Sequence, residues 1–406
     1  MYPGLLADGI RRYLGLIART LVPGRRGCSR ATLRHYALAP LLLALLPIAA
    51  AYHWLGLLLD ELLFRGYRRV RVREPVFVLG VPRSGTTALH HTLAADPQFT
   101  TLRTWECLLA TSVTWRWCWW GIGRADRWLG GHGRRRLERL DGRLLGGLND
   151  VHAVALYSPE EDYLALLPAL GCFVLIVLAP DAGAIWRLGR FDADLREGER
   201  RRLMRLYHRV VQRHLYFHGT GRRFLAKNAS FAPAAASLLE TFPDARVLAC
   251  LREPAGAVAS QLDALDPTIA AIHGRYRREV LCERIVSTFV FHYRHLLETL
   301  GQADDDRAVL IPSGALRRDM RGTIMAAYHR LGLALTPAFA RHLAALPVAG
   351  SAGGGTRHDL GRFGATAATV QQRFADVRAA FDFDATELRR PGDCARIAAA
   401  TARDAA

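Results

Sequence analysis

Short apolar runs alternate with longer amphipathic segments along most of the chain after residue 75. The runs are rich in aliphatic side chains, so we predict buried strands at 75–81, 224–227, 245–251 and 308–312. The segments between them repeat apolar positions at helical spacing. We predict helices at 87–95, 134–148, 159–170, 194–217, 232–242, 254–265 and 275–300, and a strand or helix at 171–179. This alternation is typical of an α/β protein with a parallel sheet covered by helices on both faces.

A longer apolar run lies nearer the N-terminus. Residues 37–59 contain no Asp, Glu, Lys or Arg, and a helix of this length is able to cross a bilayer. Pro40, Pro47 and His53 interrupt the run, and arginines flank it on both sides, without the asymmetry that orients a spanning helix. We therefore favour a helix lying in the cytoplasmic leaflet, with arginines on anionic headgroups; a true span and a helix buried against the protein stay open.

These patterns divide the chain into two parts. Residues 1–74 are basic and apolar, and we expect them to associate with a membrane. Residues 75–406 contain the alternating strands and helices and form the predicted α/β domain. Within that domain, four tryptophans fall in residues 115–120, a composition that suits either a membrane interface or an apolar substrate pocket.

Composition narrows the range of partners. Hydrophobic residues are 50% and charged residues 23% of the chain, which allows a large core and excludes disorder, collagen and coiled coil as the main state. The 55 Lys and Arg against 37 Asp and Glu give a net charge of +18, which favours an anionic partner. No nucleic-acid-binding motif is recognised, so a membrane surface or a phosphorylated small molecule is the better expectation. Of these 55 basic residues, 54 are arginines and one is a lysine, Lys227.

The cysteines and histidines do not predict a metal site. The seven cysteines are scattered without a C-x-x-C pair, which favours a reducing compartment over a disulfide framework. His208, His214 and His218 are spaced by six and four residues, and without carboxylate or cysteine partners they do not indicate a metal site. The N-terminus shows no signal-peptide pattern, and a cytoplasmic location is the simplest expectation.

The turn after the first strand has the composition of an anion-binding loop. Gly80 and Gly85 have the spacing of a P-loop, G-x-x-x-x-G-x-[ST], between a predicted strand and a predicted helix. Thr86 occupies the place of the loop lysine, and the strand at 245–251 is followed by Arg252 rather than by an aspartate that would hold magnesium. The loop is therefore expected to bind a phosphate-like group without the usual triphosphate–magnesium chemistry.

At these motifs the sequence resembles the sulfotransferases that use 3′-phosphoadenosine 5′-phosphosulfate (PAPS), and within them the bacterial branch with hydrophobic or lipid-like acceptors. The resemblance extends from about residue 75 to residue 381. The matching segments are PRSGTT (82–87), WE (105–106), HA (152–153), PEED (159–162), FLAKN (224–228), PDARVLACLREPAGAVAS (243–260) and RHDLGRFG (357–364). Two segments depart from the branch: NAS (228–230) stands where a proline is usual, and HD (358–359) stands where Tyr-Ser is common.

The resemblance implies a set of donor-binding residues. For the phosphosulfate they are Pro82, Arg83, Ser84, Gly85, Thr86 and Thr87. The 3′-phosphate would take the guanidinium fork of Arg252 and the hydroxyl of Ser260, and Arg357 belongs to the looser C-terminal match. PAPS is negatively charged at both ends, which agrees with two anion sites at the carboxyl ends of parallel strands. No metal is expected.

Sulfuryl transfer to a hydroxyl needs a base and positive charge near the leaving group. Glu106 is the leading base, because several sulfotransferases have a glutamate at this place and because its apolar neighbours would raise its pKa. His152 is the alternative base. Lys227 ends a predicted strand, and we expect its compact ammonium to contact the phosphosulfate or the acceptor.

The predicted function is transfer of the sulfuryl group of PAPS to a hydroxyl of a lipid or other apolar acceptor, at the inner face of a membrane. Two alternatives stay open. A small-molecule P-loop kinase would use ATP and magnesium, and a membrane-bound nucleotide-binding protein would not turn over. The arrangement of Glu106, Lys227 and Arg83 separates catalysis from mere binding, since a catalytic site needs them around one pocket.

Overall fold

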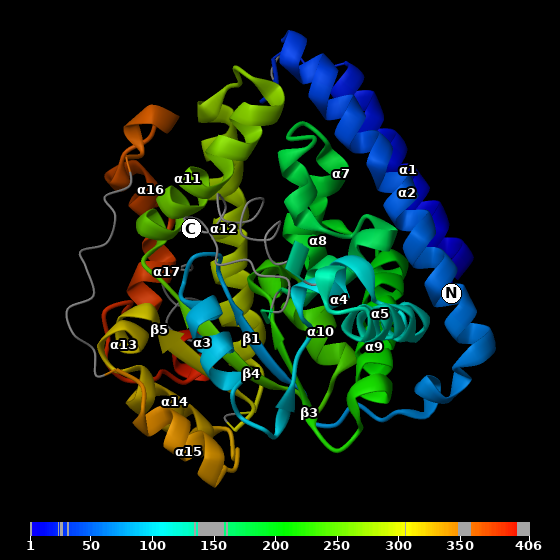
Figure 1. Ribbon diagram of the computed structural model, residues 1–406. Helices are drawn as coiled ribbons and strands as arrows, with labels where there is room; N and C mark the ends of the chain where they lie inside the picture. The colour runs from blue at the N-terminus through cyan, green and yellow to red at the C-terminus, as the bar shows by residue number, and fades with distance from the viewer. Residues whose placement is uncertain are drawn as a thin grey trace.

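Five parallel strands form one twisted sheet at the centre of the molecule (Figure 1). The computed structural model describes residues 2–22, 24, 27–30, 32–133, 135–136, 158–159, 161–304, 306–347 and 359–395. The strands are β1 (Val76–Gly80), β2 (Phe99–Thr100), β3 (Arg223–Lys227), β4 (Arg246–Leu251) and β5 (Ala308–Pro312), and their order in the sheet is β2-β3-β1-β4-β5. The four predicted strands and the parallel α/β class are confirmed.

Helices surround the sheet. The α-helices are α1 (Tyr2–Leu21), α2 (Leu33–Leu63), α3 (Thr86–Leu93), α4 (Thr104–Leu109), α5 (Val113–Trp128), α7 (Gly183–Trp186), α8 (Phe191–Asp194), α9 (Glu197–His218), α10 (Ala235–Thr241), α11 (Pro254–His273), α12 (Arg278–Gly301), α13 (Ser313–Arg318), α14 (Met320–Arg330), α15 (Pro337–Ala344), α16 (Ala367–Arg373) and α17 (Ala375–Ala380). The 3-10 helices are η1 (Arg65–Arg69), η3 (Asp162–Ala169), η4 (Phe173–Val177), η5 (Arg187–Arg190), η6 (Ala229–Ala234) and η7 (Gly361–Phe363).

The side chains of β1 alternate between two hydrophobic cores because successive strand residues point to opposite faces. Phe77 and Leu79 join the larger core, which includes buried residues of α9, α10, α11 and α12. Val76 and Val78 join the smaller core with residues of α3, α14 and α15. Both faces of the sheet are thus covered, and a strand buried on both sides reads as the continuous apolar run seen in the sequence.

Several segments differ from the sequence-based expectation. The predicted helix at 159–170 is the 3-10 helix η3, which contains Pro168, and the ambiguous run at 171–179 forms the 3-10 helix η4. The two-residue strand β2 and the helices α13 to α17 were not predicted, because these elements are short, and α1 was not predicted as a separate helix within the apolar N-terminal region. Most of the predicted helix at 134–148 lies outside the described residues.

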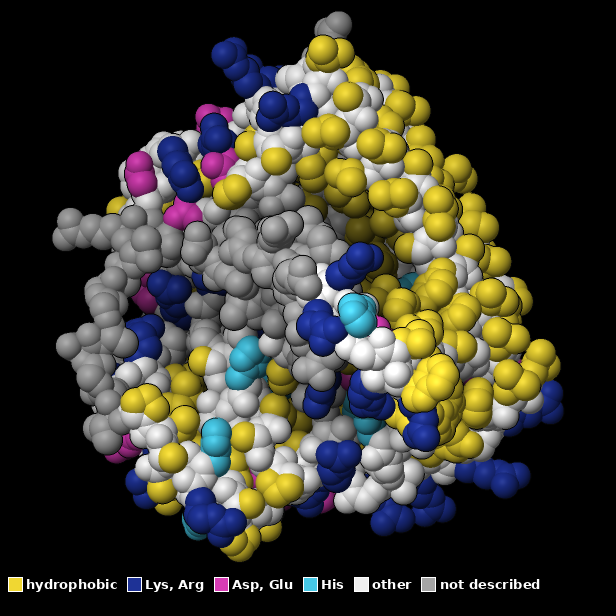
Figure 2. All heavy atoms as spheres, in the orientation of Figure 1, with side chains coloured by type: hydrophobic (Ala, Val, Ile, Leu, Met, Phe, Trp, Pro, Cys, Tyr) yellow, Lys and Arg dark blue, Asp and Glu magenta, His cyan; other side chains and the backbone are white. Residues whose placement is uncertain are grey.

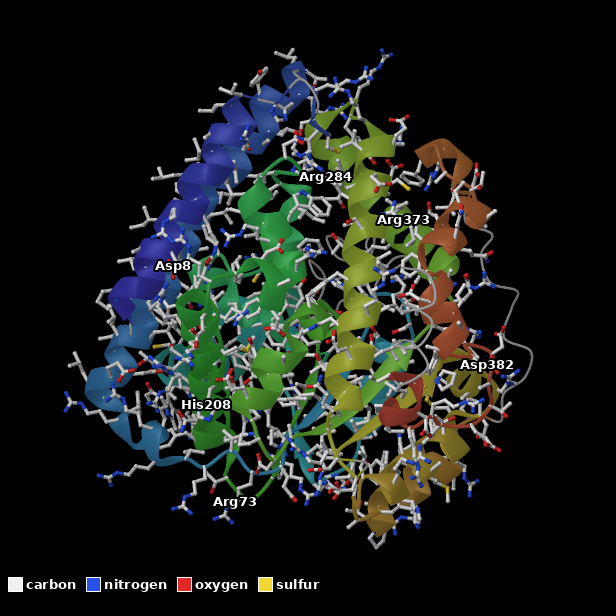
Figure 3. The ribbon with its side chains drawn as sticks, turned by 180° about the vertical axis from the view of Figure 1, so that it is seen from behind. Asp8, Arg73, His208, Arg284, Arg373 and Asp382 are labelled. Atoms are coloured by element: carbon white, nitrogen blue, oxygen red, sulfur yellow. The ribbon has the colours of Figure 1, made fainter. Side chains whose placement is uncertain are left out.

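The N-terminal helices pack along one side of the molecule. From the front and from behind, α1 and α2 lie side by side and run along the domain (Figures 1 and 3). The apolar run at 37–59 lies within α2, which continues through Pro40 and Pro47. Asp8 of α1 binds Arg202 of α9, and Arg12 binds Glu199, so buried ion pairs fix α1 to the domain.

The sheet order places a natural ligand crevice beside β1. After β1 the chain forms β2 and β3 on one side of this strand and then crosses to form β4 and β5 on the other side. Ligands of open α/β sheets bind at the carboxyl ends of the strands where the order reverses in this way. The predicted anion loop follows β1 at this point.

Candidate active site

The loop between β1 and α3 has backbone angles that require its glycines. Gly80 has a φ of 145°, and a Cβ at this position would lie 2.2 Å from the carbonyl oxygen of Cys250 on β4. Gly85 has a φ of 94° and is the N-cap of α3, while Arg83 adopts a left-handed φ of 70°. The Ser84 hydroxyl donates a hydrogen bond to the Val81 carbonyl at 2.7 Å and closes the turn from inside. The result is a tight loop that leads into the amino end of a helix, where an anion is stabilised.

The two predicted anion-binding motifs meet in the structure. The Arg83 Nε lies 3.1 Å from the hydroxyl of Ser260, which is on α11. Arg252, just after β4, donates from Nη1 to the Arg83 carbonyl at 3.2 Å. Segments more than 160 residues apart in sequence therefore form one basic cluster at the carboxyl ends of β1 and β4.

Positive charge accumulates around Arg252. Burial lowers the pKa of the Arg252 guanidinium, and the neighbouring Arg317 and Arg83 lower its pKa further. Arginine keeps its proton under all ordinary conditions, so this lowered pKa expresses an electrostatic cost rather than a neutral side chain. A bound phosphate would relieve that cost, as expected of an anion site.

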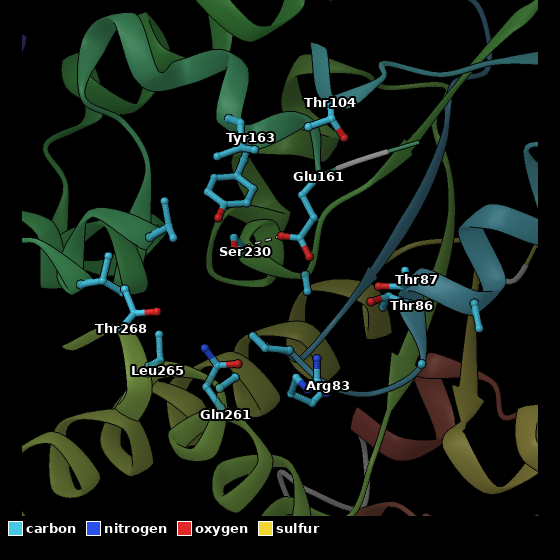
Figure 4. A pocket seen from close by; sticks show the side chains of 18 of the residues that line it. Arg83, Thr86, Thr87, Thr104, Glu161, Tyr163, Ser230, Gln261, Leu265 and Thr268 are labelled. Atoms are coloured by element: carbon cyan, nitrogen blue, oxygen red, sulfur yellow. Dashed lines mark hydrogen bonds between the residues drawn. The ribbon is translucent and has the colours of Figure 1, made fainter. Parts of the chain in front are cut away.

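A cavity of about 640 Å³ opens next to this basic cluster (Figure 4). One part of its wall consists of the loop and of Arg252, with the hydroxyls of Thr86 and Thr87 and the guanidinium of Arg83 exposed to it. Another part is apolar and comes from several elements. Its side chains are Leu108 of α4, Tyr163 and Leu164 of η3, Val174 and Val177 of η4, and Leu265 of α11. The cavity thus has room for an anionic group at one side and an apolar molecule at the other.

Glu161 projects into the cavity opposite the loop (Figure 4). One carboxylate oxygen lies 3.1 Å from the Nζ of Lys227, and the other accepts a 3.4 Å hydrogen bond from the Ser230 hydroxyl. Lys227 Nζ also donates to the Thr87 hydroxyl at 3.3 Å, and its side chain is 1% exposed. Lys227 therefore connects the anion loop with the carboxylate on the opposite wall.

The segment around Glu161 is held by its neighbour Asp162. The buried carboxylate of Asp162 accepts a hydrogen bond from Asn228 Nδ2 at 2.7 Å and another from the hydroxyl of Tyr207. Burial raises the pKa of Asp162 to about 7, although both hydrogen bonds lower it. Asn228 thus anchors η3 to the end of β3.

Comparison with known proteins identifies the family. Residues 75–337, well over half of the chain, match the family model of the sulfotransferases. The chain belongs to the sulfotransferase family. Sequence relatives are the omega-hydroxy-beta-dihydromenaquinone-9 sulfotransferases Stf3 of Mycobacterium bovis and Mycobacterium tuberculosis, each 26% identical over 272 residues. These matches cover 64% of this chain, which spans 63% of the length of the relatives.

Solved structures agree on the fold of this sulfotransferase. Sulfotransferase STF1 from Mycobacterium tuberculosis H37Rv has a TM-score of 0.70 at 21% identity, with 91% of this chain and 92% of that one covered. Sulfotransferase STF9 from Mycobacterium avium has a TM-score of 0.68 at 16% identity, with 94% and 97% covered. At such identities the likeness establishes the shared fold.

Glu106 of the sulfotransferase does not line the cavity. Thr104 and Leu108 of the same helix do, and Glu106 lies about 200° around α4 from Thr104. Its carboxylate is buried, 2.7 Å from His218 Nε2 and 3.3 Å from Arg116 Nε. Burial acts to raise the pKa of Glu106, but Arg116 and His214 hold that pKa well below its usual range. The expectation of a raised pKa is therefore wrong.

His214 and His218 of α9 have a carboxylate partner in the structure, Glu106 of α4, although the sequence near them offers none. Ligand atoms of Glu106, His214 and His218 lie within 4.8 Å of one another, the spacing of a metal site. The buried guanidinium of Arg116 already supplies positive charge at the Glu106 carboxylate, which disfavours a cation there. We interpret the cluster as a structural network that fixes α4 and α9 against each other.

The sulfotransferase site differs in part from the sequence-based one. The structure brings together Arg83, Thr86, Thr87, Arg252 and Lys227, with Ser260 behind Arg83. Glu161 was not predicted as a catalytic residue, since its place on the cavity wall depends on the isolated bridge between Glu161 and Lys227. His152 and Arg357 lie outside the described residues, so their predicted roles stay predictions.

Proposed function

We propose that this sulfotransferase transfers the sulfuryl group of PAPS to a hydroxyl of a lipid or another apolar acceptor. The observation that supports this most is that one cavity combines a basic, hydroxyl-rich part with an apolar part. The sulfotransferase relatives named for a menaquinone derivative support an apolar acceptor for this chain as well.

The donor would occupy the basic part of the cavity. Its 5′-phosphosulfate fits the loop at Arg83, Ser84, Gly85, Thr86 and Thr87, where the amino end of α3 favours an anion. Its 3′-phosphate fits Arg252 and Ser260, whose guanidinium and hydroxyl supply hydrogen-bond donors. Arg357 is proposed as a further donor contact, on the basis of the resemblance alone.

The acceptor hydroxyl would lie between the sulfur atom and Glu161. The acceptor oxygen forms a bond to sulfur, and the bond between sulfur and the bridging phosphate oxygen breaks. Glu161 takes the hydroxyl proton, and adenosine 3′,5′-bisphosphate leaves with the bonding electron pair. We favour Glu161 over Glu106 as the base because Glu161 lines the cavity, whereas Glu106 is enclosed by Arg116, His214 and His218.

Lys227 would stabilise the leaving group. At rest its ammonium is shared between the carboxylate of Glu161 and the hydroxyl of Thr87. When Glu161 takes up the acceptor proton, the ion pair loses its negative member. The ammonium then interacts more strongly with the charge that appears on the bridging oxygen next to the loop. Proton transfer and leaving-group stabilisation are coupled through this one lysine.

A water-soluble donor and a lipid acceptor meet only where an aqueous phase borders a membrane. We therefore propose that the enzyme works at the inner face of a membrane, where the reducing compartment suggested by its free cysteines also lies. Residues 1–74, which lie outside the matched family range, are the proposed attachment region, and 75–406 the proposed sulfotransferase domain.

Donor specificity is tested by thermal unfolding with adenosine 3′,5′-bisphosphate and, separately, with ATP and magnesium. The bisphosphate should raise the Tm of the wild type, and Arg252→Ala should reduce this rise severalfold because one phosphate partner is lost. Arg341→Ala, an exposed arginine of α15, is the matched control and should respond as the wild type does. Stabilisation by ATP and magnesium alone would contradict the proposal and favour a kinase.

A further inference from the structure

The outward sides of α1, α2 and α5 form an extended apolar surface, which we call the apolar face (Figure 2). Of the 26 exposed large hydrophobic side chains among the described residues, four are on α1, ten on α2 and five on α5. Soluble monomers rarely expose continuous apolar patches beyond a few hundred Å². Two adjacent helices of 20 and 31 residues that expose aliphatic side chains along their length exceed that limit.

The polarity of α2 is inverted relative to a helix of a soluble protein. Three of its polar side chains are buried against the domain: His35 contacts His273, His53 contacts Thr111, and Asp60 binds Arg213. The outward positions between the ends of the helix are aliphatic. They include Leu38, Leu41, Leu45, Ile48, Leu55 and Leu58, each at least 38% exposed. A surface helix in contact with water has its apolar side towards the protein and its polar side outward. A helix in contact with lipid has aliphatic side chains outward, as α2 does.

The buried contacts also fix the orientation of α2. His35 and Asp60 lie near opposite ends of the helix, about 37 Å apart at 1.5 Å per residue, and both bind the domain. Because the helix is attached along its whole length, it cannot cross a bilayer without carrying the charged interior of the protein into the hydrocarbon. Of the orientations left open by the sequence, the one that fits is a helix lying in the membrane plane.

The charges around the apolar face favour lipid over a second copy of the chain. Arg34 stands exposed at the start of α2, and Arg65, Arg68 and Arg69 stand exposed just after its end. Because both ends are basic, a second copy packed in either direction would place arginines against arginines. Anionic headgroups would instead neutralise them, and the exposed tryptophans Trp117, Trp120 and Trp128 of α5 suit the interface between headgroups and hydrocarbon.

We infer that the apolar face is immersed in one leaflet of an anionic membrane and that an apolar acceptor enters the cavity from that leaflet. The geometry at the middle of α2 supports the second part. His53 Nε2 lies 3.0 Å from the Leu108 carbonyl, and Trp54 Nε1 donates to the Pro168 carbonyl at 2.9 Å. Leu108 is 39% exposed, lines the cavity and contacts α2 through its carbonyl, so the apolar cavity wall reaches the protein surface beside α2. The entry route rests on the proposed lipid acceptor, whereas immersion of the face does not.

Flotation with vesicles tests the immersion. The full-length protein is mixed with vesicles of phosphatidylcholine and phosphatidylglycerol in equal parts and centrifuged through a density gradient. Wild type should float, and Leu45→Glu with Ile48→Glu should reduce the partition coefficient about tenfold or more, because two carboxylates would enter hydrocarbon. Met325→Glu with Leu335→Glu, on exposed apolar side chains away from the face, is the matched control and should float as the wild type does.

Cys118 provides a second readout that requires no substitution. Of the seven cysteines, all in the described part of the chain, it is the one exposed to solvent, and it lies on α5 between Trp117 and Trp119. Its reaction with a water-soluble, membrane-impermeant maleimide should slow severalfold when vesicles are added.

Three results would overturn the inference. In the first, the wild type does not float with the vesicles. In the second, both double variants float equally well, and in the third, the protein is a dimer in solution that only Leu45→Glu with Ile48→Glu dissociates. Flotation needs neither donor nor acceptor, so it can fail while binding of adenosine 3′,5′-bisphosphate stands, and the reverse also holds. The entry route requires that Leu45→Glu with Ile48→Glu lose sulfation of lipid held in vesicles while keeping bisphosphate binding; unchanged sulfation of such lipid would exclude that route.

Discussion

At the scale of single residues, the structure separates two carboxylates that look equivalent in the sequence. Glu106 and Glu161 each follow a motif resembling the family pattern, yet one is enclosed by cations and the other lines the cavity. Sequence alone could not separate them. A shift of two positions along α4 turns a side chain to the opposite side of the helix, and no sequence pattern fixes where so short a helix begins. The grouping of Arg83, Arg252 and Ser260 was predictable because each lies in a local strand-loop-helix motif, and their roles towards the donor stay predictions.

Glu161→Gln tests the assignment of the base. The amide keeps the shape of the carboxylate but cannot accept the acceptor proton, so turnover should fall about 10²–10⁴-fold with donor binding retained. Glu106→Gln is the comparison. It should lower the Tm because Arg116 would lose its negative partner, whereas the turnover of the folded fraction should fall less than in Glu161→Gln. A larger loss of turnover for Glu106→Gln than for Glu161→Gln, in protein folded at the assay temperature, would return the base to Glu106.

Lys227→Arg tests the coupled ion pair. The planar guanidinium keeps the charge but does not fit a site that is 1% exposed between Thr87 and Glu161. Turnover should fall at least about tenfold, with binding of adenosine 3′,5′-bisphosphate changed less. Turnover near the wild-type value would remove Lys227 from the mechanism.

At the scale of elements, the cavity depends on how η3 is joined to β3. Asp162 links η3 to the end of β3 through Asn228 and to α9 through Tyr207, and these links place the adjacent Glu161. The unfolded carboxyl has a pKa near 4, whereas burial raises the pKa of folded Asp162 to about 7. Between these values the unfolded state is ionised while the folded state keeps its proton. Asp162 therefore makes the stability fall as the pH rises from about 4 to about 7.

Asp162→Asn should remove this pH dependence. The Tm of the variant minus that of the wild type should increase between about pH 5 and about pH 7, as measured by thermal unfolding in matched buffers. Asp304→Asn, at an exposed carboxylate, should show a difference that does not vary over the same range. A constant difference for Asp162→Asn would mean that Asp162 titrates in the folded protein as it does in the unfolded chain.

At the scale of the whole molecule, the sequence-based account was most accurate where apolar runs are long and uninterrupted. The strands and their parallel arrangement followed from such runs, because a strand buried on both faces leaves a continuous signal. The run at 37–59 left three orientations open, since hydropathy does not say which side of a helix meets the protein. The partners of His35, His53 and Asp60 show which side of the helix meets the protein, and the opposite, aliphatic side is the one that we propose to face lipid.

The measurement that tests the central claim most directly is transfer of radiolabelled sulfate from PAPS. The full-length enzyme is incubated with labelled PAPS and a membrane lipid extract, and the lipid products are separated and analysed by mass. We expect label in an apolar product whose mass has increased by one sulfuryl group, with no such product from Glu161→Gln. Label that stays in the aqueous phase under conditions where adenosine 3′,5′-bisphosphate stabilises the protein would contradict the account.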